Sequence, residues 1–179
     1  MKNLFRIFTT VMFFLMINEG EAQDFGEPVR QALSKLDFVI GEWEGEGWVM
    51  MPQGNRETSI VTESIHYDLD NTIITLKGLG MSERDGEKIK VHDALGVMYY
   101  DPFAKEYKMK SWLSRGMSTD ANVKVEDEGN IVWWFKAGPV GTIRYTIKIR
   151  DGKWNEIGEM SQDGENWTKF FEMNLVKKS

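Results

Sequence analysis

Three residue types are scarce in this sequence. Its 179 residues include no cysteine, two histidines and four prolines. The absence of cysteine excludes disulfides, zinc–thiolate sites and thiol catalysis. The fold must therefore be stabilised by burial of apolar side chains, for which seven tryptophans and ten phenylalanines provide the material.

Positive charge is also limited. The chain has 22 Lys and Arg against 28 Asp and Glu, and its formal net charge is −6. Nucleic-acid binding requires a basic patch, so no DNA or RNA partner is expected. His66 and His92 fall in the polar phase of their segments and are expected to face outward. Neither is spaced with carboxylates as a metal ligand would be, so the sequence predicts no metal site, no cofactor and no Ser-His-Asp triad.

Only one long apolar run occurs, between residues 7 and 17, and it follows the basic residues Lys2 and Arg6. The small residues Gly20 and Ala22 come shortly after it. This order is typical of a secretory signal peptide, and the run is too short to span a bilayer as a helix. We expect residues 1–22 to be removed and 23–179 to form one exported domain, periplasmic or extracellular, without a membrane anchor.

The segment from Pro28 to Leu36 has the pattern of a short helix. Proline suits the first helical position, and Val29, Ala32, Leu33 and Leu36 recur at helical spacing. No later window shows a sustained helical period.

Turn signals recur at regular intervals after this helix. They are Gly54-Asn55, Asp70-Asn71, Asp85-Gly86, Asp101-Pro102, Arg115-Gly116, Glu128-Gly129, Gly138-Pro139, Asp151-Gly152 and Asp163-Gly164. Nine turns separate ten segments rich in β-branched and aromatic residues, which predicts a meander. Closure would remove its exposed edges. The predicted class is all-β: a single antiparallel up-and-down β-barrel of about ten strands with a short N-terminal helix.

Apolar side chains alternate with polar ones along most of these segments, as expected for one dry and one wet face. The predicted inward sets are Val61, Ile65 and Tyr67; Val91, Leu95, Val97 and Tyr99; Tyr107, Met109 and Leu113; Ile143, Tyr145, Ile147 and Ile149; and Trp167, Phe171, Met173 and Leu175. Trp133 and Trp134 are adjacent, so one of them must point outward.

The run Leu36-Asp37-Phe38-Val39-Ile40-Gly41-Glu42-Trp43 resembles the opening of lipocalin-like (calycin-like) barrels, in which a short helix leads into Gly-x-Trp. The later run from Ala94 to Pro102 is similar to uncharacterised secreted bacterial proteins of this architecture. The resemblance implies that Trp43 closes one barrel end and that the interior holds a small apolar ligand. Nitrobindin-like and fatty-acid-binding barrels are more distant. The strand 167–176 lacks the haem-binding histidine of the former, and no Arg-x-Tyr pair matches the latter.

Polar residues in the apolar phase are the candidate ligand-binding residues. They are Glu63, Asp93, Ser111, Glu156 and Lys169, and Tyr145 adds a hydroxyl from the same phase. A two-residue turn at Asp163-Gly164 would place Gly158 opposite Lys169 and Glu156 diagonal to it. Glu156 and Lys169 would then form either a hook for a polar ligand head or an internal salt bridge.

The leading hypothesis is an exported barrel that binds a small apolar or amphipathic molecule. An alternative is an isomerase or cyclase that uses Glu63, Asp93, Glu156 and Lys169 as acid–base groups. A third is a structural or protein-interaction role of the outer face, where Trp112 and one of Trp133 or Trp134 would be exposed.

Overall fold

The computed structural model describes residues 25–178 and shows ten antiparallel strands in a closed barrel. The predicted signal peptide, residues 1–22, lies outside the described residues. The elements are α1 (Gly26–Ser34), η1 (Asp37–Val39), β1 (Gly41–Met50), β2 (Arg56–Asp68), β3 (Ile73–Arg84), β4 (Glu87–Asp101), β5 (Glu106–Leu113), β6 (Ser118–Asp127), β7 (Asn130–Lys136), η2 (Gly138–Val140), β8 (Thr142–Arg150), β9 (Lys153–Ser161) and β10 (Thr168–Lys177). The all-β class, the ten strands and the up-and-down order are confirmed.

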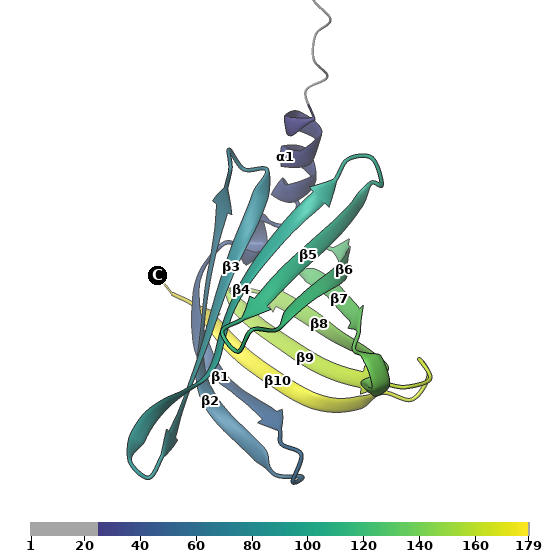
Figure 1. The fold of residues 1–179 in the computed structure, drawn as a ribbon. Coiled ribbons are helices and arrows are strands. Elements are labelled where there is room, and N and C mark those ends of the chain that lie inside the picture. The colour runs from purple at the N-terminus through teal and green to yellow at the C-terminus, as the bar shows by residue number, and fades with distance from the viewer. Residues whose placement is uncertain (1–24, 179) are drawn as a thin grey trace, which may run out of the picture.

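Each strand pairs with its neighbours in sequence, and β1 pairs with β10 to close the barrel (Figure 1). Closure removes the two outer strand edges that an open ten-strand meander would expose. Several predicted turn residues adopt the left-handed backbone that a tight hairpin requires, among them Asp85, Gly86, Asp151 and Gly152.

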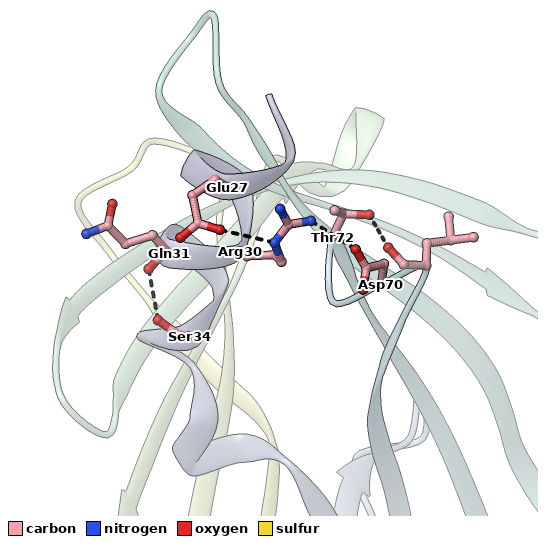
Figure 2. Close-up of polar contacts among 7 residues, drawn as sticks. Glu27, Arg30, Gln31, Ser34, Asp70 and Thr72 are labelled. Carbon is pink, nitrogen blue, oxygen red and sulfur yellow. Dashed lines mark hydrogen bonds and ion pairs between the residues drawn. The ribbon is translucent and has the colours of Figure 1, made fainter. Parts of the chain in front are cut away.

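The helix α1 lies across one end of the barrel (Figure 1). Its predicted start and end were each about two residues late, since the structure ends it at Ser34 and continues into η1. Arg30 bridges Glu27 of the same helix and Asp70 of the β2–β3 turn, at 3.4 and 3.1 Å (Figure 2). Two tyrosine hydroxyls also hold α1, because Tyr67 donates to the Leu33 carbonyl and Tyr107 to the Ala32 carbonyl.

Trp43 packs beneath this helix with 1% of its surface exposed. Its Nε1 donates a hydrogen bond to the Val39 carbonyl at 2.8 Å, and its ring meets Trp154 edge-on at 5.4 Å. The expectation that Trp43 closes the barrel under the helix is confirmed.

The interior differs between the two ends of the barrel. Towards α1 the inward side chains are buried, among them Ile65, Ile74, Ile131, Ile149 and Leu175. Towards the opposite end the inward side chains keep partial exposure, among them Leu76, Ser111, Trp133, Phe135, Ile143, Tyr145 and Phe171. Because these side chains point inward, the exposure means that solvent reaches into this half of the barrel.

One predicted strand phase is wrong. In β4 the buried residues are Gly96 and Met98, whereas Leu95 and Tyr99 are 47% and 39% exposed. The inward phase of β4 includes the small residues Ala94 and Gly96, which contribute little to a hydropathy pattern, whereas the outward phase carries the apolar Leu95, Val97 and Tyr99. An irregularity in the β3–β4 pairing, which leaves Val91 without a partner, further disturbs the alternation. His92 shares the inward phase with Gly96 and Met98, so its predicted outward phase is wrong. Its side chain is nevertheless exposed, because it lies near the end of the barrel opposite α1, here called the open end.

Candidate functional site

Glu63, Tyr145 and Glu156 are the predicted site residues that the fold brings together. Glu63 comes from β2, Tyr145 from β8 and Glu156 from β9. Each shares the inward phase of its strand with buried residues such as Val61, Ile147 and Trp154. These three side chains therefore meet inside the barrel, midway between the packed end and the open end.

Two indole groups hold Glu156. Trp133 Nε1 donates to one carboxyl oxygen and Trp154 Nε1 to the other, both at 3.2 Å. Trp154 lies two residues before Glu156 on β9, so the strand alternation puts both on one face. Trp133 comes from β7, beyond Tyr145 on β8. The carboxyl group is buried, and each of its oxygens accepts one indole hydrogen bond, which fixes its orientation.

Glu63 has no hydrogen-bond or ion-pair partner among residues 25–178. Among the described residues, Arg144 Nε is the side-chain N or O atom that is both buried and without a partner. The Glu63 oxygens lack a partner as well, so they must keep some contact with solvent. Gly78 lies opposite on β3, where an added Cβ would come within 2.6 Å of a Glu63 oxygen. The glycine therefore makes room for the carboxyl group, which faces the solvent-accessible interior.

Burial shifts the ionisation of both carboxyl groups. Burial raises the pKa of Glu63 to about 8, and the neighbouring Glu156 adds to the rise. Burial also raises the pKa of Glu156 to about 7, although the hydrogen bonds from Trp133 and Trp154 oppose it. At neutral pH both carboxyl groups are therefore partly protonated, and the pair carries well below two negative charges.

Tyr145 belongs to an aromatic wall beside this pair. Its ring stacks on Trp133 with a centroid distance of 4.0 Å and an interplanar angle of 8°, and it meets Phe171 edge-on at 5.7 Å. Gly158 lies between Tyr145 and Phe171, and an added Cβ there would come within 2.8 Å of Tyr145 and 2.9 Å of Phe171. Burial, and secondarily Glu156, raise the pKa of Tyr145, so its hydroxyl stays protonated. This hydroxyl has no protein partner within the described chain and remains available to a ligand.

Ser111 faces inward as predicted, on β5 between Gly96 and Thr119 of the adjacent strands. It lies in the half-exposed part of the interior, on the side of the barrel away from β8 and β9.

The predicted interior positions of Asp93 and Lys169 are wrong. Asp93 follows the outward phase of β4 and pairs with Lys90. Lys169 is exposed and pairs with Glu172 at 2.7 Å. A bulge in β10 adds a residue between Lys169 and Phe171, so that Phe171 instead of Lys169 faces Gly158. The predicted Glu156–Lys169 contact does not form.

Trp167, which was predicted to face inward, also lies elsewhere. Trp167 stacks on the guanidinium group of Arg144 at 3.8 Å, and Arg144 is ion-paired with Glu159, so this cluster lies on the outer face. Of the adjacent tryptophans, Trp133 is the inward one. Trp112 is 40% exposed, as expected.

The role of Trp133 and Trp154 as donors to Glu156 was not predicted from the sequence. The Trp154 signal was present, because residues two apart on a strand share a face. The Trp133 contact could not be found this way, since it spans two strand pairings.

A surface hollow of about 520 Å³ lies at the helix end, bordered by Phe38, Trp43, Arg150 and Lys177. It contains none of the predicted site residues. Among residues 25–178, no three His, Asp or Glu side chains gather as a metal site. None of the helices in this range is long and apolar enough to cross a membrane.

A scan against family models and a search of curated sequences gave no match. Solved structures are similar in fold. Rv2717c from M. tuberculosis matches with a TM-score of 0.63 and 13% identity, over 83% of this chain and 98% of that chain. The S-type phycobiliprotein lyase CPES from Guillardia theta matches with a TM-score of 0.56 and 13% identity, over 87% and 98%. Lobster apocrustacyanin A1 matches at 0.37 and 13%, over 86% and 69%. With its closed ten-strand barrel and N-terminal helix, the chain has a lipocalin-like (calycin-like) fold.

Proposed function

We propose that the protein binds a small amphipathic molecule inside the barrel. The observation that carries this proposal is the Glu63 carboxyl group, which has no protein partner among residues 25–178 and faces solvent-accessible space beside an aromatic wall. A ligand that donates a hydrogen bond to this group gains on the order of 0.5–3 kcal/mol. Natural ligand sites combine an apolar wall with a few placed polar groups in the same way.

The aromatic wall and the polar groups would contact different parts of the ligand. Trp133, Tyr145 and Phe171 offer flat apolar surface to the body of a ligand. Glu63 and the Tyr145 hydroxyl offer hydrogen bonds to its polar head. The pattern favours an amphipathic molecule over a purely apolar one.

Two measurements test this proposal. Native mass spectrometry of protein purified without denaturation should show a mass above that of the polypeptide, which denaturation removes. The fluorescence of N-phenyl-1-naphthylamine, a neutral apolar probe, should rise on addition of the protein. Absence of both signals would refute interior binding.

The carboxyl pair supports a second candidate function, acid–base catalysis on such a ligand. Glu63 and Glu156 both titrate near neutral pH, as general acids and bases do. Asp93 and Lys169 lie on the outer face of the barrel, so they cannot act as acid–base groups on an interior ligand. The S-type phycobiliprotein lyase is an enzyme by its name, so the fold is compatible with catalysis. Incubation of the co-purified molecule in D₂O would test it, with deuterium incorporation expected for the wild type and lost in Glu63→Gln.

Export of the protein belongs to the same proposal. The signal-peptide pattern of residues 1–22 supports it. N-terminal sequencing of the protein from its native cells should begin at Gln23, and an intact N-terminus would refute cleavage.

A further inference from the structure

The interior site contains two carboxyl groups and no cation. Glu63 lies opposite Trp43 on β1 and Gly78 on β3, neither of which can titrate. Glu156 lies opposite Ile147 on β8 and Met173 on β10. Among the described residues, no lysine or arginine pairs with either carboxyl group, and the titratable side chain that joins them is Tyr145.

Several carboxylates of the outer face have basic partners. Glu172 has Lys169, Glu159 has Arg144 and Asp93 has Lys90. The interior pair has no such neighbour among residues 25–178. No basic side chain in this range therefore balances the negative charge that appears when the pair ionises.

We infer that the ligand carries a protonated amine, seated against Glu63 and Glu156, on a planar apolar body that packs against Trp133, Tyr145 and Phe171. This rests on the proposed function and names the chemical class of its ligand. An ammonium group brings donors for the Glu63 oxygens, which no protein group serves. It also neutralises the charge that the two carboxyl groups share.

The aromatic wall suits the same ligand. The face of an aromatic ring attracts a cation, and the effect grows when water is excluded. The Tyr145–Trp133 stack lies beside Glu156, because Trp133 donates directly to that carboxyl group. An amine that enters from the open end would pass this wall before it reaches Glu63.

Three naphthalene probes of matched shape test the inference: 1-naphthylmethylamine, 1-naphthylmethanol and 1-naphthoate. They share one ring system and carry charges of +1, 0 and −1 near neutral pH. Isothermal titration calorimetry at pH 7.5 should show the amine binding about 10- to 100-fold more tightly than the alcohol, the range of one charge-assisted hydrogen bond. The naphthoate should bind more weakly than the alcohol.

Proton release provides a second readout. The bound ammonium lowers the pKa of both carboxyl groups, so the complex should release about one proton at pH 7.5. Titrations in phosphate and in Tris, which differ in heat of ionisation, measure that number. Binding of the alcohol should release none.

Glu63→Gln is the decisive variant, because it keeps the shape of the side chain and removes its charge. It should reduce the amine-to-alcohol preference to about threefold or less while the alcohol still binds. Glu46→Gln makes the same change at an exposed outward position and should leave the preference intact.

The outcomes separate the inference from the proposed function. Equal affinity for amine and alcohol in the wild type would overturn the amine assignment and leave interior binding standing. Retention of the full preference in Glu63→Gln would also overturn it. Failure of all three probes and of N-phenyl-1-naphthylamine would refute interior binding and the amine with it.

Discussion

Tyr145 and Trp133 stack nearly parallel across the β7–β8 pairing, with ring centroids 4.0 Å apart. Gly158 on the next strand allows this arrangement, since a methyl group there would overlap the Tyr145 ring. The stack in turn holds Trp133 where its indole reaches Glu156. A glycine thereby controls the orientation of a carboxyl group on its own strand through two aromatic rings.

Gly158→Ala should disrupt this stack. The new Cβ would lie 2.8 Å from Tyr145 and 2.9 Å from Phe171, so the rings must move. Overpacking of this kind costs about 1–3 kcal/mol of unfolding free energy. Urea unfolding would measure the loss, and near-UV circular dichroism would report the altered stack. Gly96→Ala is the matched control, because its Cβ would meet Leu76 at an ordinary 3.5 Å; equal losses in both variants would contradict the prediction.

The carboxyl pair should make the protein less stable as pH rises. Glu63 has an ordinary pKa of 4.5 when unfolded and about 8 when folded. Its contribution to stability is full below pH 4.5 and is lost progressively up to pH 8, by an amount on the order of a few kcal/mol. Glu63→Gln should therefore gain stability relative to the wild type between pH 5 and pH 8.5. Urea unfolding at both pH values, followed by tryptophan fluorescence, checks the sign.

In that experiment, the difference between the variant and the wild type cancels the contributions of the other titrating groups to the pH dependence of stability. His92 has a lowered pKa and acts with the opposite sign, but it is present in both proteins. A parallel pH dependence of the two proteins would show that Glu63 ionises normally.

Trp43→Phe should weaken the closed end of the barrel. The change removes the hydrogen bond to Val39 and part of the contact with Trp154. The expected loss is about 2–3 kcal/mol, from a buried cavity and an orphaned carbonyl group. Trp112→Phe at an exposed position should cost less than about 0.5 kcal/mol in the same urea unfolding assay. A loss for Trp43→Phe no larger than that of the control would refute the sealing role.

Lys169→Met should leave ligand binding unchanged. The side chain lies outside the barrel and contacts Glu172 and the ring of Trp48. Exposed ion pairs contribute less than about 1 kcal/mol, so stability should change little. The affinity for N-phenyl-1-naphthylamine is the measurement, and a clear fall would return Lys169 to the interior site.

The sequence by itself determined the strand count and the barrel closure, and its resemblance to lipocalin-like barrels implied the sealing role of Trp43. Turn residues and period-two alternation are local signals, and they are strong where a segment alternates without interruption, as from Ile143 to Ile149. The same signals placed Glu63, Tyr145 and Glu156 on the inward face. The prediction failed at Lys169 because a bulge in β10 exchanges the two faces of the strand. It failed at Asp93 because Leu95 and Tyr99, the apolar residues that set the predicted phase of β4, face outward.

Only the tertiary structure decided which inward groups meet. Glu63 and Glu156 are 93 positions apart, and their proximity depends on the path through β1 and β10 that closes the barrel. The donation from Trp133 to Glu156 also crosses two strand pairings. Ionisation follows from that closure, since burial raises the pKa of both carboxyl groups, and Glu156 adds to the rise at Glu63, only when the sheet has curved around both.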